Sequence, residues 1–235
     1  MEYNYRISID ILFLFLVILV FFTPAQDYPP ELKIPVTIYD FHSDGSCPDF
    51  NPQKENAPVI PGMVENKLDK DGRPVNKKNS EYFSYYVANW FRSSENNEQP
   101  VTDKKPQYNS DGKFIRETDV TENPYVNIKI YDTLTFIHIG NGMYEYNDSS
   151  YFPIDDRGFG IEPTWNYNGT RLLNDHNYGF TLMMETEFTY KKDMTFSFRG
   201  DDDVWVFIDD NLVLDIGGIH TQQSDNFNLS DFETQ

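Results

Sequence analysis

A short apolar run enclosed by carboxylates constrains the fold of this chain more than any other feature. Residues 204–208 read VWVFI, and Asp201, Asp202 and Asp203 come directly before them. Five residues are a usual length for a strand and too few for a typical helix. Successive side chains of a strand point to opposite faces, and both faces of this run are apolar. The run therefore predicts a strand that is covered on both sides.

Other segments repeat the two-residue periodicity of half-buried strands. In residues 180–190 apolar side chains alternate with threonine and glutamate, so one face should pack and the other should face water. Residues 209–211, Asp-Asp-Asn, tolerate the positive φ of a tight turn. We expect further strands at residues 36–41, 126–130, 134–139, 143–146, 195–199 and 212–216, with a Gly-Asn-Gly turn at 140–142. The predicted fold class is all-β, an antiparallel sandwich or barrel.

The N-terminal part, residues 34–122, is less regular than the β-rich part, residues 123–235. Residues 43–71 and 93–113 are rich in polar residues and proline, which indicates loops. Between these loops aromatic residues recur every four positions, and Ser80 is suited to cap a helix. We therefore predict one short helix near residues 81–92.

The first 25 residues have the pattern of a secretory signal peptide. Arg6 lies in a short polar start, residues 11–22 are unbroken apolar, and Thr23-Pro24-Ala25 offers small residues before Gln26. The apolar run is shorter than the roughly 20 residues that span a bilayer. We expect cleavage after Ala25, secretion, no membrane span in the mature chain, and one domain over residues 26–235.

Charge and modification motifs agree with an extracellular protein. The net charge is −19, and an acidic surface repels phosphates, so we expect no nucleic acid partner. Asn147, Asn168 and Asn228 each begin an N-x-S/T acceptor, and after a signal peptide we expect a glycan on at least one of them. Cys47 is the single cysteine, so no intrachain disulfide can form.

No motif predicts an enzyme. The chain has no G-x-S-x-G elbow, H-E-x-x-H helix, phosphate-binding glycine loop or C-x-x-C pair. His42, His138, His176 and His220 are scattered, and we expect structural or surface roles for them. Two of the many carboxylates could converge for glycoside hydrolysis, but spacing in sequence does not give their separation in space. A glycan-processing enzyme therefore remains only an alternative.

The aspartates before the apolar run are the candidate metal site. Calcium takes six to eight oxygen ligands, and Asp201, Asp202 and Asp203 supply hard oxygens on a loop before a strand. In the other interpretation the run is a turn in which aspartates accept hydrogen bonds from backbone N–H groups. The spacing alone does not decide between a calcium site and a turn.

The same residues resemble a known domain. The segment GDDDVWVFI at 200–208, followed by residues 212–218 and His220, is similar to the fibro-slime type of PA14 domain. Residues 36–41, 48–50, 152–155, 158–160 and 180–190 agree with this similarity. The chain resembles the prespore-cell-inducing factor family of secreted cellular slime mould proteins over residues 34–235.

The resemblance implies a PA14 β-sandwich or barrel in an extracellular glycoprotein. In calcium-dependent carbohydrate binders of the wider PA14 group, two adjacent aspartates of this loop bind the ion, and the ion binds sugar hydroxyls. By position these two are Asp201 and Asp202, whereas Asp203 stands where many relatives have glycine. The family's domain continues past the Gly-Gly-x-His segment into further strands and a second loop, so we expect a C-terminally incomplete domain.

The sequence as a whole predicts a secreted, glycosylated, non-enzymatic recognition domain. Its expected activity is calcium-assisted binding of glycans or of a cell-surface glycoprotein in intercellular signalling or cell differentiation. One alternative is an extracellular matrix protein in which the aspartates only shape a turn. Which ligand it binds, and its oligomeric state, do not follow from the sequence.

Overall fold

The computed structural model describes residues 4–11, 16–20, 28–42, 59, 61–75, 77, 90–92, 127–165, 171–191, 194–200, 202–218 and 220–232. In this part of the chain strands dominate and one 3₁₀ turn follows the last of them. The elements are β1 (Asn4–Ile11), β2 (Leu16–Val20), β3 (Glu31–Phe41), β4 (Asn127–Gly140), β5 (Met143–Asn147), β6 (Thr164–Trp165), β7 (Arg171–Leu172), β8 (Phe180–Thr189), β9 (Thr195–Gly200), β10 (Val204–Ile208), β11 (Asn211–Ile216), β12 (Gln223–Asn228) and η1 (Leu229–Phe232).

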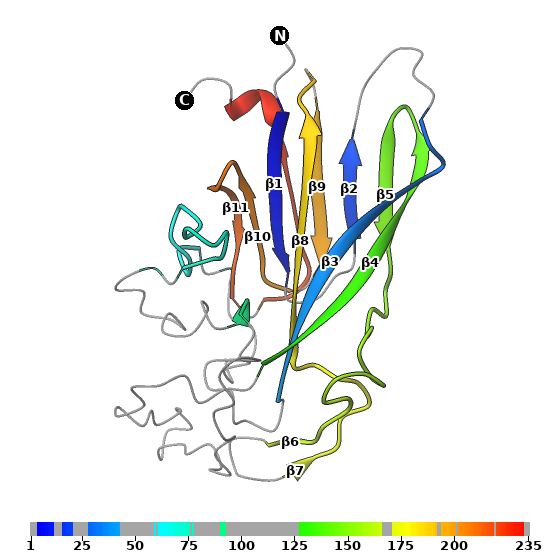
Figure 1. The fold of residues 1–235 in the computed structure, drawn as a ribbon, viewed down its shortest axis with the longest axis vertical. Helices are drawn as coiled ribbons and strands as arrows, with labels where there is room; N and C mark the ends of the chain where they lie inside the picture. The colour runs from blue at the N-terminus through cyan, green and yellow to red at the C-terminus, as the bar shows by residue number, and fades with distance from the viewer. Residues whose placement is uncertain are drawn as a thin grey trace.

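Ten of these strands form one sheet in the order β11-β10-β1-β8-β3-β4-β5-β2-β9-β12. Every neighbouring pair is antiparallel, and the two outer strands, β11 and β12, contact each other, so the sheet curls into a half-barrel. β6 and β7 pair separately and lie at the end of the molecule away from the two termini (Figure 1). The all-β class predicted from periodicity is confirmed.

The strand predicted to be covered on both faces is β10. Its bounds are those of the apolar run, and all five of its side chains are buried. Val204, Val206 and Ile208 belong to the cluster on the inner face of the sheet, and Trp205 and Phe207 belong to a second cluster on the outer face. β10 lies between β11 and β1, so its backbone is paired on both edges.

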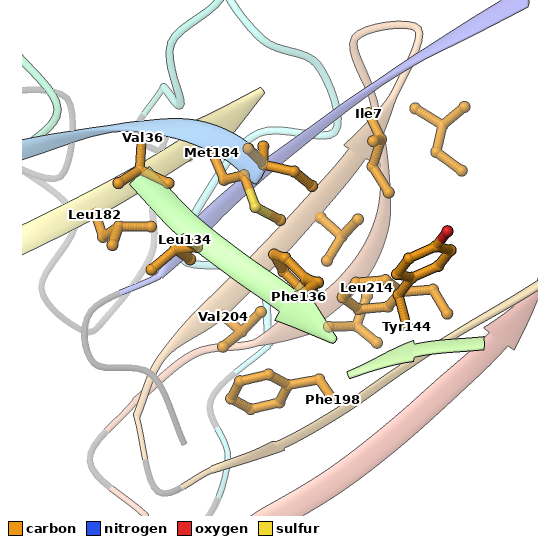
Figure 2. Close-up of a cluster of buried hydrophobic side chains, with 14 of the residues drawn as sticks. Ile7, Val36, Leu134, Phe136, Tyr144, Leu182, Met184, Phe198, Val204 and Leu214 are labelled. Atoms are coloured by element: carbon orange, nitrogen blue, oxygen red, sulfur yellow. The ribbon is translucent and has the colours of Figure 1, made fainter. Parts of the chain in front are cut away.

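The inner cluster fills the space enclosed by the curled sheet. Leu134 and Phe136 of β4 point from one wall toward Val204 of β10 and Phe198 of β9 on the other (Figure 2). Because strands far apart in the order of the sheet meet in this cluster, it holds the curl closed. Its other buried members include Ile7, Val36, Ile38, Tyr144, Phe180, Leu182, Met184, Phe196, Leu214 and Ile216.

The outer cluster is covered by irregular chain from the N-terminal part. Met63, Val64 and Leu68 come from the segment that lies beside β11, coloured cyan in Figure 1. The backbone of this segment is tied to the β10–β11 hairpin, because the Leu68 N–H donates to Asp210 O at 3.0 Å and the Leu212 N–H donates to Asn66 O at 2.9 Å. These bonds also cover the outer edge of β11, which an open sheet would expose.

The alternation predicted for β8 holds only in its second half. From Glu185 to Phe188 exposed and partly buried side chains alternate, but the first five side chains are all buried. Thr181, which we expected to face water, is fully buried and donates its hydroxyl hydrogen to the Trp90 carbonyl oxygen. The prediction was wrong for this half because Trp90 and Phe91, remote in sequence, cover the outer face there.

β4 is one strand of 14 residues, whereas we predicted two strands separated near residues 131–133. It pairs with β3 without interruption from Glu31 opposite Ile137 to Phe41 opposite Asn127. β3 itself begins at Glu31, five residues before its predicted start at residue 36. The polar residues in the middle of β4 are accommodated because side chains of its outer face reach solvent, with Tyr131 69% exposed.

Both predicted hairpin turns have the expected backbone. Asn141 and Gly142 have φ of 54° and 71°, and Asp209 and Asp210 have φ of 47° and 65°. Positive φ at both central residues is the type I′ geometry, whose twist matches that of paired strands. The choice of Asn-Gly and Asp-Asp at these positions is therefore explained by local conformation.

The segment predicted as a signal peptide contributes two interior strands. β1 lies between β10 and β8, and β2 lies between β5 and β9. Ile7 and Ser8 of β1 are buried. Cleavage after Ala25 stays a prediction, and it would remove both strands from the sheet.

One further prediction falls largely outside the described residues. Of the helix expected near residues 81–92, only residues 90–92 are described, and Trp90 and Phe91 are buried in the outer cluster. Within the described ranges the chain forms no helix with the length and apolar character needed to cross a bilayer.

The inner cluster predicts a contrast between two aromatic residues of β4. Phe136→Ala removes a fully buried ring, and large-to-small changes of this kind cost about 3–5 kcal/mol. Tyr131→Ala, on the same strand but 69% exposed, should change the free energy of unfolding by no more than about 0.5 kcal/mol. Urea denaturation of the full chain followed by tryptophan fluorescence measures both values. Equal effects of the two changes would show that the curled sheet does not enclose this core.

Candidate functional site

Of the three predicted metal ligands, Asp202 and Asp203 are described and lie directly before β10. Asp201 lies outside the described residues. Asp202 is partly exposed, whereas Asp203 is buried beneath the turn. Asp203 accepts a hydrogen bond from the backbone N–H of Gly218, in the segment that follows β11. Asp203 thus ties the start of β10 to the chain that leaves β11.

The electrostatics of Asp203 follow from its burial. Desolvation raises the pKa of the Asp203 carboxyl to about 7, the nearby Asp215 carboxylate adds to the rise, and the Gly218 hydrogen bond opposes it. Asp215 is also partly buried, and burial raises its pKa. Its carboxylate accepts from the Gly62 N–H at 2.6 Å and from Trp205 Nε1–H at 3.0 Å. The two carboxylates therefore join β10, β11 and the segment that covers the outer face.

His220 lies on the same stretch of chain as Gly218 and is buried. Its Nδ1 donates to the Thr221 carbonyl oxygen at 3.0 Å. Among the described residues Nε2 has no hydrogen-bond partner. The predicted structural role of His220 is consistent with this burial, although it does not explain the orphaned nitrogen.

The described residues supply an incomplete set of ligands for calcium. No group of three His, Cys, Asp or Glu side chains within the described ranges is arranged to hold a metal ion. Asp203 is buried and already accepts a backbone hydrogen bond from Gly218, so its carboxylate joins two segments of the fold. Asp202, which is partly exposed although its Oδ2 atom is buried, is the other described carboxylate of the run, and Asp201 is its sequence neighbour.

A second polar site lies where β3 ends, and sequence reasoning did not single it out. Asp40 is fully buried within β3. Its carboxylate accepts from the Phe159 N–H at 2.6 Å and from Asn177 Nδ2 at 3.1 Å. Asn177 in turn accepts from the Gly179 N–H at 2.7 Å. Asp40 therefore anchors the loop between β5 and β6 and the chain that leads into β8.

Two histidines flank this anchor. His42 lies 2.8 Å from Glu162 and stacks on Phe159, with ring centroids 3.7 Å apart. His176 lies 2.7 Å from Asp155 and stacks on Phe152 at the same centroid distance. Both imidazoles pair with a carboxylate and an aromatic ring, so the predicted structural role of these two histidines fits their contacts.

Glycine at position 158 is required by the approach of Asp40. Gly158 has φ of 58°, and a Cβ atom built there would lie 2.0 Å from Asp40 Oδ2. The Gly158-Phe159-Gly160 sequence and the buried aspartate of Tyr39-Asp40-Phe41 were the available signals for this site. A carboxylate within an otherwise buried strand needs donors, and the loop supplies them.

An apolar cavity of about 290 Å³ opens at the end of the half-barrel near η1. Ile7 of β1 forms part of its wall, with Tyr28, Leu32, Phe188, Phe196 and Leu229 among the other lining residues. Among the described residues that line it, Glu187 and Lys191 are the charged ones. Apolar surface dominates the cavity wall, so few polar groups are available to orient a sugar.

Two of the three predicted glycosylation acceptors are described. Asn147 ends β5 and Asn228 ends β12, and both are exposed. Asn168 lies outside the described residues. Exposure leaves Asn147 and Asn228 accessible to modification, and glycosylation itself stays a prediction.

The architecture so described defines an all-β half-barrel domain with an acidic run directly before β10. No known family profile matches the chain, and no solved structure matches it. Curated proteins do: it is 32% identical to protein psiD of Dictyostelium discoideum over 213 residues, which cover 88% of this chain and 36% of psiD. It is 32% identical to protein psiE over 223 residues and 30% identical to protein psiO over 238 residues, both of the same organism.

These matches make the chain a homologue of the Dictyostelium psi proteins over most of its length. The three alignments cover 88% to 91% of this chain. The chain spans 29% to 39% of the length of these relatives. The predicted similarity to a slime mould family is therefore supported by proteins that align with nearly the whole chain.

The Asp203–Gly218 hydrogen bond predicts that Asp203→Ala destabilises the fold. Loss of the acceptor leaves a buried N–H unsatisfied, which costs about 1–3 kcal/mol. Asp203→Asn keeps an acceptor oxygen and should cost less than the alanine change. Urea denaturation at pH 5 measures both, and an alanine variant as stable as the wild type would exclude this role for Asp203.

The buried Asp40 predicts a pH dependence of stability. Desolvation raises its pKa from 3.8 to about 6, Glu162 adds to the rise, and the Phe159 and Asn177 hydrogen bonds and His42 oppose it. The folded state therefore binds the Asp40 proton more tightly than the unfolded state. The resulting stability is fully present below about pH 4 and is lost as pH rises through about 6.

The loss attributable to Asp40 is on the order of 2–3 kcal/mol. Asp40→Asn cannot ionise, so the difference in unfolding free energy between wild type and variant should shift by this amount between pH 4 and pH 7. A difference that stays constant over this range would show that the Asp40 carboxyl is not the titrating group.

Proposed function

We propose that this protein is a secreted, glycosylated, non-enzymatic recognition protein of the psi family, built on a PA14 domain of the fibro-slime type. Its proposed activity is calcium-assisted binding of glycans or of a cell-surface glycoprotein, in intercellular signalling or cell differentiation. The observation that carries the proposal is the homology to psi proteins over most of the chain. The signal-peptide pattern and the exposed acceptors Asn147 and Asn228 support secretion and glycosylation.

The proposed calcium site is the turn before β10. Asp201 and Asp202 are the residues that would hold the ion, because adjacent carboxylates on a loop are hard oxygen ligands. A calcium ion bound there would offer open coordination positions to the hydroxyl groups of a sugar. Asp203 is proposed as a positioning residue, since its carboxylate holds Gly218 beneath the turn.

One observation favours a second function. The Asp203 carboxylate accepts the Gly218 N–H, so at least this aspartate of the run has a structural role in the fold. If Asp201 and Asp202 act in the same way, the protein is a structural component of the extracellular matrix with no metal site.

Calcium titration separates the two functions. Isothermal calorimetry on the wild type should show saturable calcium binding, and the double change Asp201→Asn with Asp202→Asn should weaken it at least about tenfold, because each change removes an anionic ligand. The matched control is Asp225→Asn, an exposed carboxylate on β12 that should leave the affinity unchanged.

Negligible heat for the wild type would remove the calcium site and favour the matrix function. A glycan array probed with the wild type, with calcium and then with a chelator, tests the sugar separately. Glycan binding that persists in chelator would contradict calcium assistance while leaving glycan recognition in place.

A further inference from the structure

Two interior positions of the sheet are filled by residues that carry the pattern of a cleaved leader. β1 pairs along its length with β8 and over five residues with β10, and β2 pairs over five residues with both β5 and β9. Residues 11–22 and the small residues at 23–25 meanwhile predict removal of the whole segment. The same residues thus serve the fold and are expected to leave it.

Removal of residues 1–25 would break the sheet at two places. The ten-stranded order would divide into β11-β10, β8-β3-β4-β5 and β9-β12. Four strand edges would lose their partners, on β10, β8, β5 and β9. The edge of β10 is the least tolerable of these, because all five of its side chains are buried and an exposed apolar edge recruits another strand.

The geometry of the β1 position specifies what can fill it. β8 and β10 are both antiparallel to β1, so they run parallel to each other and accept one strand of the opposite direction between them. At the position of Ile7 the strand must be apolar, because this side chain is 4% exposed and belongs to the inner cluster. At the position of Ser8 it must be small, because that side chain is 2% exposed.

The carboxylates around Arg6 also define which charge is favoured in the β1 position. Arg6 Nε lies 3.2 Å from Glu185 of β8, and Arg6 Nη2 lies 3.6 Å from Asp210 in the β10–β11 turn. The backbone of Arg6 is held on the same side, since its N–H donates to Asp209 Oδ1 at 3.0 Å and its carbonyl accepts from the Asp209 N–H at 3.0 Å. Three carboxylates therefore surround the residue that precedes the apolar one, and they favour a basic residue there.

We propose that, once residues 1–25 are removed, the β1 position is a strand-acceptor site for a partner polypeptide. The occupant is an extended segment in which a basic residue is followed by an apolar and then a small residue, added antiparallel to β8 and β10. Within residues 26–235 no lysine or arginine is followed by an apolar residue and then by glycine, alanine or serine, so the proposed donor segment is not among these residues. Main-chain hydrogen bonds on two edges give the affinity, and the Ile7 and Arg6 positions give the selectivity.

This inference rests on the predicted cleavage, and it is independent of calcium. Loss of calcium binding in the preceding experiment would leave the strand-acceptor site untouched. Conversely, failure of strand binding would leave the aspartate turn as proposed.

The test keeps the full chain through folding. Residues 23–25 are replaced by a protease recognition site, the full chain is folded, and it is then cut there. The probe is a fluorescent synthetic peptide with the sequence NYRISIDI of residues 4–11, added in excess to the cut protein. Its fluorescence anisotropy reports binding, and mass spectrometry reports whether the resident N-terminal segment is displaced.

Matched peptides test the chemistry of the position. An Ile7→Pro peptide has no backbone N–H at this position, and its ring does not replace the isoleucine side chain. It should bind at least tenfold more weakly. An Arg6→Glu peptide places an anion among Glu185, Asp209 and Asp210 and should bind several-fold more weakly, with a difference that shrinks as salt is raised. The uncut full chain is the control, and it should bind none of the peptides because β1 occupies the site.

The outcomes decide the proposal. Saturable binding of NYRISIDI to the cut protein, with displacement of the resident segment and discrimination against the two variants, supports it. Absence of binding, or equal binding of the Ile7→Pro peptide, overturns it. A second measurement is N-terminal mass spectrometry of the full chain after secretion from a eukaryotic host, and retention of residues 4–20 in the secreted protein also overturns it.

Discussion

Burial of β10 on both faces is the constraint on which the rest of this structure depends. A strand with apolar side chains on both sides needs a covering layer on each face, so one layer packed against the sheet is not enough. The curled sheet covers the inner face, and the irregular N-terminal part supplies Met63, Val64 and Phe91 for the outer face. The irregular N-terminal part is therefore required for the β domain to pack, because it carries the residues that complete the outer cluster.

The polar groups around β10 follow from the same burial. Backbone and side-chain donors that are drawn under the second core must find acceptors there. Asp203 satisfies the Gly218 N–H, and Asp215 satisfies the Gly62 N–H and the Trp205 indole. Asp202 and Asp203 are adjacent in sequence but differ in burial. Asp203 therefore holds Gly218, whereas Asp202 is partly exposed with its Oδ2 atom buried.

Features set by local sequence could be predicted. Features that depend on contacts with residues remote in sequence could not. Periodicity and turn chemistry predicted β10 with its bounds and the positive φ of Asp209 and Asp210. The buried half of β8 was missed because Thr181 is polar, and only Trp90 and Phe91, about 90 residues earlier, explain its burial. Of the sites, the aspartate turn was predicted, but the Asp40 anchor was missed because its donors, Phe159 and Asn177, come from separate loops.

The N-terminal segment combines features of a leader with features that the sheet uses. The apolar run, residues 11–22, has the composition of a signal-peptide core, and five of its residues form the interior strand β2. Arg6 precedes this run, as a basic residue does in a leader, and in β1 it also meets Glu185 and Asp210. A gap beside β10 favours a segment in which a basic residue precedes an apolar one, because closing the gap pairs two edges and buries the apolar side chain at once. The fit of residues 4–11 to the β1 position therefore follows from the Arg6 and Ile7 contacts and not from the apolar run.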